Sequence, residues 1–173
     1  NGNIANQDKL RHEKENAGWA FMSDTDSEII VRMIANQLSK NYSITKSIQL
    51  TMEDLVGSYS IVLLHNDKVL AFRDPLGIKP LCVGQIEDGF VVASESSAIE
   101  IMGGNVIRDV EPGEIISIDS NGIKSHSITK SEHKAFCMFE YVYFARPDAK
   151  IDGILTYSVR QRIGHKLWEE APL

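Results

Sequence analysis

The chain has 173 residues, of which 43% are hydrophobic and 24% are charged, and its formal net charge at pH 7 is −6. This composition is typical of a folded globular protein, and the acidic balance without a dense Lys/Arg cluster argues against nucleic acid as a partner. No apolar run reaches the ~18 residues of a membrane span, and two cysteines far apart in sequence indicate a reducing, cytoplasmic setting.

The first residues are Asn1-Gly2, a dipeptide typical of a turn, and neither an initiator Met nor a signal peptide precedes it. We therefore expect these residues to be internal to a longer protein. Residues 7–16 are polar and predict a short surface helix or an ordered loop. Residues 19–22, which contain two bulky aromatic side chains, predict a short strand.

Two amphipathic helices are expected next. Thr25 and Glu28 have the spacing of a capping box, which predicts a helix that begins here and runs to about Lys40. Thr45 is the predicted cap of a second helix, which Gly57 ends.

After Gly57 the apolar period changes from that of helices to that of strands. Residues 58–65 and 68–72 are β-favouring runs joined at Asn66-Asp67, which predicts a hairpin. Further strands are expected at 81–86, 90–94, 106–110, 114–119 and 123–129, with a short helix at 96–102. Helices followed by a long antiparallel meander indicate a layered α+β fold.

The last part of the chain has a different pattern. Residues 139–145 are apolar throughout, which predicts a strand covered on both faces. Val159, Ile163 and Leu167 recur at helical spacing and predict a terminal helix.

No familiar nucleotide loop or serine-hydrolase elbow is present, and the five histidines show no metal-binding spacing. Residues 73–81 carry two prolines and one glycine, which predicts a rigid corner between strands whose entrance Arg73 and Asp74 hold by pairing.

Five motifs occur in a specific order: N-G-N-I at 1–4, S-x-T-D-S-E at 23–28, G-x-Y-S at 57–60, R-D-P-L-G-I-K-P-L at 73–81 and A-S-E-S at 93–96. As an ordered set they resemble the class II glutamine amidotransferases. The resemblance implies a four-layer αββα sandwich of the N-terminal-nucleophile (Ntn) hydrolase type, lacking its N-terminal portion. It also implies a cysteine nucleophile that lies upstream of this chain, so that these residues alone are inactive.

The second half indicates the branch of the family. Residues 108–114 and 139–148 resemble the amidophosphoribosyltransferase family of purine synthesis. In that family glutamine is hydrolysed and the ammonia displaces pyrophosphate from phosphoribosyl pyrophosphate. The resemblance implies glutamine and phosphoribosyl pyrophosphate as partners, and a homo-oligomer. Two alternatives stay open: the glutaminase half of an asparagine synthetase or amino-sugar synthase, and a non-catalytic binding module with the same fold.

The resemblance also implies roles for four residues. Asn1 and Gly2 match the oxyanion hole, and Asp26 matches the carboxylate that binds the α-amine of glutamine, so Asn1 and Asp26 are expected to line one cleft. On their own, Asn1-Gly2 is equally a plain turn and Asp26 an acid that favours a helix start. Cys137 matches an iron–sulfur ligand of cluster-bearing members, and a 4Fe-4S cluster and Mg²⁺ are implied only for the full-length protein.

Neither cysteine is expected to be the nucleophile, and Cys82 is expected to be a buried apolar residue. We expect two domains: residues 1–130 as a partial glutaminase domain, and residues 131–173 as a linker with the beginning of a phosphoribosyltransferase domain.

Overall fold

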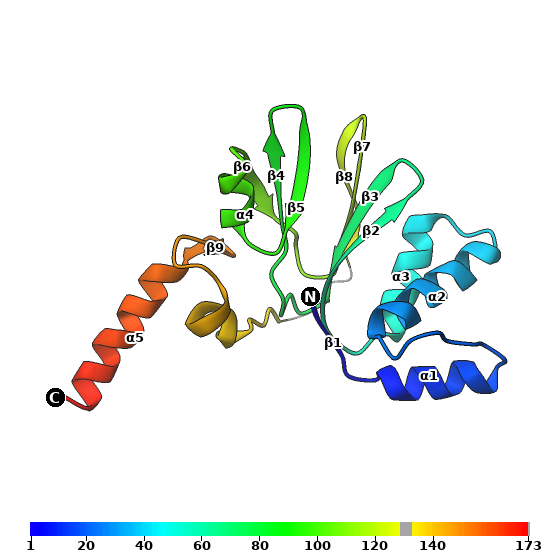
Figure 1. Cartoon of the computed structure of the whole chain (residues 1–173), viewed down its shortest axis with the longest axis horizontal. Coiled ribbons are helices and arrows are strands. Elements are labelled where there is room, and N and C mark those ends of the chain that lie inside the picture. Colours follow the sequence, from blue (N-terminus) through cyan, green and yellow to red (C-terminus); the bar gives the residue numbers. More distant parts are fainter. Residues whose placement is uncertain (129–132, 173) are drawn as a thin grey trace.

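Two antiparallel sheets face each other at the centre of the fold, and helices cover the outer side of each sheet (Figure 1). The computed structural model describes residues 1–128 and 133–172. One sheet has the strand order β1-β2-β3-β7-β8, with β1 (Gly2–Ile4), β2 (Gly57–His65), β3 (Lys68–Arg73), β7 (Glu114–Asp119) and β8 (Gly122–Ile128). The other has the order β5-β4-β6, with β4 (Cys82–Ile86), β5 (Gly89–Ala93) and β6 (Asn105–Asp109).

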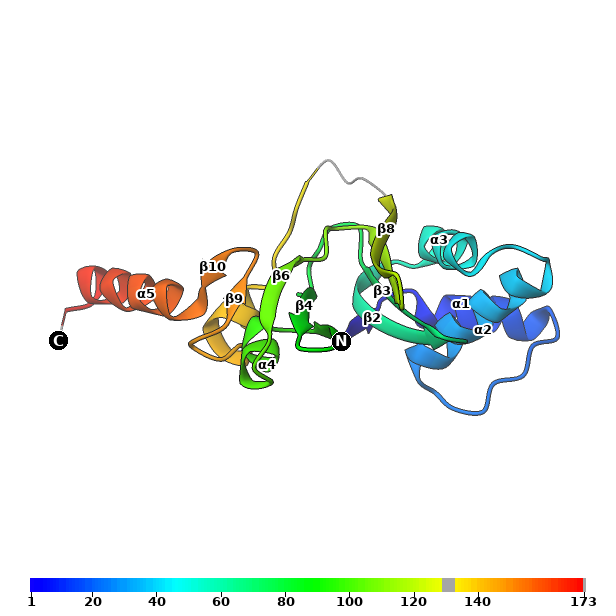
Figure 2. The ribbon, with the colours of Figure 1, turned by 90° about the horizontal axis from the view of Figure 1, so that it is seen from above.

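The helices form the two outer layers. On the five-stranded sheet lie α1 (Gln7–Asn16), α2 (Asp26–Ser39) and α3 (Ile44–Asp54), and α4 (Ser96–Ile101) lies against the three-stranded sheet (Figure 2). The helix predicted at 96–102 is thus confirmed, and residues 7–16, predicted as a helix or an ordered loop, form a helix. The order of layers is α, β, β, α. Because four layers enclose three interfaces, the middle of the sandwich is buried on both faces, as Leu70, Ala71 and Phe72 of β3 show.

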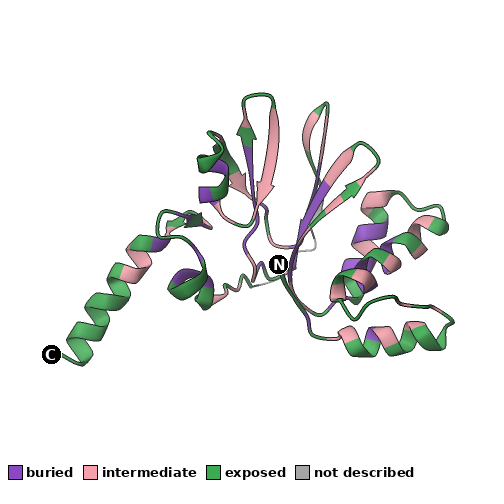
Figure 3. Cartoon of the chain, viewed as in Figure 1, coloured by how far each residue is buried: buried purple, intermediate pink, exposed green. Residues whose placement is uncertain are grey.

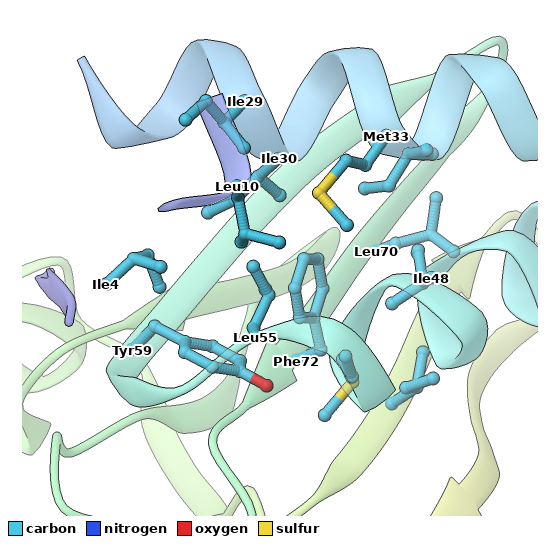
Figure 4. Close-up of a cluster of buried hydrophobic side chains, with 13 residues drawn as sticks. Ile4, Leu10, Ile29, Ile30, Met33, Ile48, Leu55, Tyr59, Leu70 and Phe72 are labelled. Carbon is cyan, nitrogen blue, oxygen red and sulfur yellow. The ribbon is translucent and has the colours of Figure 1, made fainter. Parts of the chain in front are cut away.

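β3 shows how the sequence produces this layering. Leu70 and Phe72 face α2 and α3 and join the core that Figure 4 shows, whereas Ala71 between them faces the other sheet and packs with Val83 and Ile116. Successive strand residues point to opposite faces, so three consecutive apolar residues serve two cores. Full burial of each large side chain contributes about 1.5–3 kcal/mol. β7 links the same two cores in the same way, through Ile115 and Ile116.

The helix starts differ in detail from the prediction. α2 begins at Asp26 as expected, but the Thr25 side chain makes no capping bond, so the predicted capping box is wrong. Glu28 instead accepts hydrogen bonds from the N–H groups of Met22 and Ser23, which lie before the cap. In α3 the cap is Ser43, whose hydroxyl accepts from the N–H of Lys46, and Thr45 lies inside the helix.

The strand predicted at 19–22 is absent, because no neighbouring strand is placed to pair with it among the described residues. Its amides bond locally: the N–H of Trp19 donates to the carbonyl of Lys14. The Phe21 ring lies under the guanidinium groups of Arg11 and Arg32, at 4.5 and 5.6 Å from the ring centroid. These residues therefore form an irregular loop over the helix layer.

The hairpin predicted from 58 to 72 is confirmed, with His65 opposite Lys68 across the turn. The predicted single meander is wrong. β3 pairs with β7, and a separate sheet is formed by β4, β5 and β6. The strand predicted at 123–129 corresponds to β8, and its last residue lies outside the described residues. The chain leaves the first sheet after β3 and crosses at residues 73–81 to the second sheet, so strands that are consecutive in sequence are not neighbours there.

Residues 139–145 form a π-helical turn, η1 (Glu140–Phe144), and the strand predicted there is wrong. The N–H of Ala145 donates to the carbonyl of Glu140, and Tyr143 and Phe144 are 76% and 60% exposed. An apolar run without alternation does not distinguish a strand from a helical turn. The Glu140 side chain at the start of the turn is buried and forms an ion pair with Lys79 at 2.8 Å.

Two short strands, β9 (Lys150–Ile151) and β10 (Ile154–Leu155), were not predicted. Asp152 and Gly153 form the turn between them with φ of +46° and +78°, the left-handed conformation of a tight hairpin. The predicted terminal helix is confirmed as α5 (Thr156–Glu170), which extends away from the sandwich and is largely exposed (Figure 3). None of the described helices combines the length and hydropathy that crossing a bilayer requires.

Candidate functional site

A cavity of about 130 Å³ lies between β1 and the beginning of α2. It is lined by Asn1, Gly2, Ile4, Asp26, Ser27, Ile30, Tyr59 and Ile61. Asn1 and Asp26 thus line one cavity, although they come from different layers of the sandwich. Their chemical roles stay predictions.

Asn1 and Gly2 are held by pairing with β2. The backbone N–H of Asn1 donates to the carbonyl of Ser60 (3.1 Å), and the N–H of Ser60 donates to the carbonyl of Asn1 (2.8 Å). Because a trans peptide is planar, the N–H of Gly2 points opposite to the Asn1 carbonyl and so away from β2. Among the described strands β1 is at the edge of its sheet, and Gly2 is exposed there.

Gly2 has to be glycine for two reasons. Its φ is +126°, a conformation that L side chains rarely adopt. A Cβ atom there would also lie 2.0 Å from the carbonyl oxygen of Ser58 on the paired strand. β1 can therefore approach β2 this closely only because no side chain stands between them.

Asp26 is the first residue of α2, where the partial positive charge of the helix favours a carboxylate. The preceding loop is fixed from α1: Gln7 Nε2 donates to the carbonyl of Asp24 (2.8 Å), and Arg11 Nη2 to that of Ser23 (2.6 Å). Within α2 the Glu28 carboxylate holds the same loop. Its bonds from the Met22 amide and Arg32 lower the pKa of Glu28 to about 2.

Tyr59 forms one wall of the cavity and is only 2% exposed. Its ring meets Phe72 edge to face at 6.3 Å (Figure 4). Burial, and secondarily the nearby Asp74, raise the pKa of Tyr59, so its hydroxyl stays neutral. The hydroxyl oxygen has no hydrogen-bond partner within the described part of the chain.

The 73–81 corner contacts the backbone of Tyr59 through Asp74. The predicted pairing of Arg73 with Asp74 is wrong. The Asp74 carboxylate accepts backbone N–H groups, including those of Tyr59 (3.2 Å) and Ile78 (3.1 Å). Arg73 instead forms an ion pair with Asp152 at 3.1 Å and donates to the carbonyls of Gly77, Lys79 and Val110. Arg73 and Asp74 are therefore satisfied by separate partners, and both hold the backbone of the corner by hydrogen bonds.

The cysteines lie outside the cavity. Cys82 is buried, as expected, and burial raises the pKa of its thiol to about 12, which makes it a poor nucleophile. Cys137 Sγ lies 3.7 Å from Lys79 Nζ. Among residues 1–128 and 133–172 no group of three His, Cys, Asp or Glu side chains could hold a metal. The chain alone does not supply the four thiolates of an iron–sulfur cluster.

Sequence reasoning gave no role to Tyr59, Ile30 or Ser60, although G-x-Y-S at 57–60 was among the motifs. Strand alternation places Tyr59 and Ile61 on one face, which is the available signal for that wall. The arrangement offers an amide side chain and a free backbone N–H at one end, and a carboxylate at the other. Such a cavity suits a small ligand with an ammonium group at one end and a polar carbonyl at the other.

Residues 1–100 match the glutamine amidotransferase domain family. The chain is 46% identical over its full length to the amidophosphoribosyltransferase of Archaeoglobus fulgidus and 33% identical to that of Rattus norvegicus, and covers 38% of each. It superimposes with a TM-score of 0.93 on the glutamine phosphoribosylpyrophosphate amidotransferase from Bacillus subtilis, solved in complex with ADP and GMP. That match, at 34% identity, covers 100% of this chain and 38% of the other.

The chain thus spans about two fifths of the length of the curated relatives it matches. The structural match confirms the α+β sandwich of the Ntn-hydrolase type that the motifs indicated. With the family match over residues 1–100 and this shared fold, the chain belongs to the glutamine amidotransferase domain family.

Proposed function

We propose that this chain is the glutaminase part of an amidophosphoribosyltransferase, which hydrolyses glutamine and supplies ammonia for phosphoribosylamine synthesis from phosphoribosyl pyrophosphate. The observation that carries the proposal is the cavity in which Asn1, Gly2 and Asp26 meet. The similarity to amidophosphoribosyltransferases along the whole chain supports this branch over an asparagine synthetase or amino-sugar synthase.

In the proposed reaction the Asp26 carboxylate binds the α-ammonium group of glutamine, and the carboxamide lies beside Asn1 and Gly2. A cysteine thiolate attacks the carboxamide carbon, and the resulting oxyanion accepts hydrogen bonds from the Asn1 side-chain amide and the Gly2 N–H. The α-amino group of the same cysteine takes the thiol proton and passes it to the departing nitrogen, so that the tetrahedral intermediate expels ammonia and leaves a thioester. Water then hydrolyses the thioester to glutamate and the free thiol. We propose that this cysteine lies N-terminal to Asn1 in the full-length protein, because Cys82 and Cys137 lie outside the cavity.

The proposal is tested by replacing Asn1 and Asp26 in the full-length protein and measuring two activities. Asn1→Ala is expected to lower kcat of glutamine hydrolysis about 10²–10³-fold, as loss of one oxyanion donor does elsewhere. Asp26→Asn is expected mainly to raise KM for glutamine. Both variants should retain phosphoribosylamine synthesis when free ammonia replaces glutamine, because ammonia bypasses the cavity.

Asp24→Asn is the matched control, since Asp24 is exposed in the same loop and does not line the cavity. Retained glutaminase activity in both Asn1→Ala and Asp26→Asn would contradict the assignment. A full-length protein without any glutaminase activity would favour the non-catalytic binding module.

We further propose that residues 1–130 form the glutaminase domain and residues 131–173 a linker with the first part of a phosphoribosyltransferase domain. Support comes from the separate small core around Tyr141, Ala149 and Ile151, and from the exposed α5.

In the full-length protein Cys137 is proposed as one ligand of a 4Fe-4S cluster, with Mg²⁺ bound elsewhere in the transferase part. Two free cysteines agree with a reducing, cytoplasmic location. A homo-oligomer is proposed from the same resemblance.

A further inference from the structure

We propose that Ser60 is a positioning residue for the oxyanion donors Asn1 and Gly2, and that residues 140–152 act on it through the peptide group of Lys79. This inference rests on the proposed function. It assigns no new chemistry to Ser60, which lies beside the cavity and does not line it.

Ser60 is connected to Asn1 through the main chain. Their main chains exchange two hydrogen bonds, Asn1 N–H to Ser60 O (3.1 Å) and Ser60 N–H to Asn1 O (2.8 Å). The second bond fixes the peptide plane between Asn1 and Gly2, and hence the direction of the Gly2 N–H. A rotation of the Ser60 backbone would therefore turn the proposed oxyanion donor with it.

The hydroxyl group of Ser60 connects this residue to Lys79. Its side chain is buried, and Oγ donates to the carbonyl oxygen of Lys79 at 2.9 Å. Lys79 precedes Pro80, which restricts the Lys79 backbone to extended conformations and so limits the directions its carbonyl can take. The hydroxyl of Ser60 is thus anchored on a rigid acceptor.

Lys79 is in turn connected to residues 140–152 by its side chain and by its carbonyl group. Lys79 Nζ forms an ion pair with Glu140 at 2.8 Å, and both side chains are at most 16% exposed. The Lys79 carbonyl also accepts a 2.7 Å hydrogen bond from Arg73 Nε, and Arg73 forms an ion pair with Asp152. Two carboxylates from residues 140–152 thus bind groups that contact Lys79, one at its side chain and one through Arg73.

Removing the Ser60 hydroxyl should leave the fold intact. The Lys79 carbonyl keeps the hydrogen bond from Arg73 Nε, so Ser60→Ala leaves no buried acceptor without a donor. The expected consequence is a looser Asn1–Gly2 peptide in an otherwise native cavity. Such a change weakens transition-state stabilisation more than binding of glutamine.

The experiment measures glutamine hydrolysis by the full-length protein as wild type, Ser60→Ala, Glu140→Gln and the double variant. For Ser60→Ala we expect kcat to fall at least fivefold, while KM for glutamine stays within twofold and ammonia-dependent synthesis is unchanged. Glu140→Gln should lower kcat less, and the double variant should be no slower than Ser60→Ala alone, because both changes act on one route. Ser58→Ala, in the same strand, is the control expected to match wild type.

A wild-type protein without glutaminase activity would overturn the proposed function itself. With an active wild type, an unchanged kcat in Ser60→Ala, or equal losses of glutamine-dependent and ammonia-dependent activity, would overturn the positioning role. Multiplied losses in the double variant would overturn the route through Lys79. If Ser60→Ala fails to fold, an unchanged kcat in Glu140→Gln overturns the route.

Discussion

Gly2 is the residue on which the geometry of the proposed oxyanion hole depends most directly. Gly2→Ala would place a Cβ 2.0 Å from the Ser58 carbonyl oxygen and force β1 away from β2. We expect kcat of glutamine hydrolysis to fall about 10²–10³-fold, comparable to loss of an oxyanion donor. Steady-state kinetics on the full-length variant measure this fall.

Gly18→Ala is the matched control for Gly2→Ala. Gly18 also has a positive φ, +88°, but no atom lies within 4 Å of the position of its Cβ. Both substitutions therefore introduce backbone strain, and only Gly2→Ala introduces a clash at the cavity. Equal losses of activity in the two variants would show that the close approach of β1 and β2 is unimportant.

Glu28 gives the loop before Asp26 a defined dependence on pH. Its folded-state pKa of about 2 lies below the ordinary 4.5, so the unfolded chain binds more protons between these values. The stabilisation from Glu28 is therefore complete above about pH 4.5 and is lost as the pH falls toward 2. In Glu28→Gln the thermal unfolding midpoint of the full-length protein should lie below wild type at pH 6 and converge with it toward pH 2. A constant difference across this range would contradict the assignment.

At the scale of elements, the 73–81 corner organises the crossing between the sheets. Asp74 is fully buried, and its carboxylate accepts N–H groups from the corner and from Tyr59. Asp74→Asn turns one acceptor oxygen into a donor that faces other donors. We expect a loss of about 1–3 kcal/mol in the free energy of unfolding, measured by urea denaturation. Asp88→Asn, at an exposed turn, should change it little, and equal losses would argue against the carboxylate as the organiser.

The same elements show what the sequence could predict. Periodicity identified α2, α3, α5 and the β2–β3 hairpin, because each element has an apolar face or turn residues that depend on its own sequence. The strand at 19–22 failed because a strand needs a neighbour, and the neighbour is not encoded locally. The strand predicted at 139–145 failed because an apolar run without alternation fits a strand and a helical turn alike. The local pattern also does not show that Glu140 pairs with Lys79, 61 residues away in the chain.

The candidate site shows the same division. Local patterns could place Asp26 at a helix start and Gly2 in a turn-like segment, but they could not place the two in one cavity. Only the ordered motifs, which carry the fold as a whole, predicted that arrangement. The pairing of Arg73 with Asp152 was out of reach, because the β9–β10 hairpin that carries Asp152 was not predicted.

For the whole molecule, the ion pair between Arg73 and Asp152 attaches the C-terminal segment to the sandwich. Arg73 is 1% exposed, so Asp152→Asn leaves a buried guanidinium without its counter-charge. We expect hydrogen exchange in residues 149–156 of the full-length protein to become faster, with β1 to β3 little affected. Asp148→Asn breaks an exposed ion pair with Arg146 and should leave exchange near wild type. Similar exchange in both variants would contradict the attachment.

The cavity also has a consequence for substrate choice. One side of the cavity, Asn1 and Gly2, belongs to the sheet layer, and another, Asp26, belongs to the helix layer. Ile30 of α2 also lines the cavity and joins the buried core. The spacing of the layers therefore sets the length of amino acid that can reach both sides at once. Asparagine is one methylene shorter than glutamine, and in a pocket of fixed length such a difference is worth about 1–3 kcal/mol. For the proposed substrate glutamine, the core between α2 and β2 therefore limits the length of the side chain that fits.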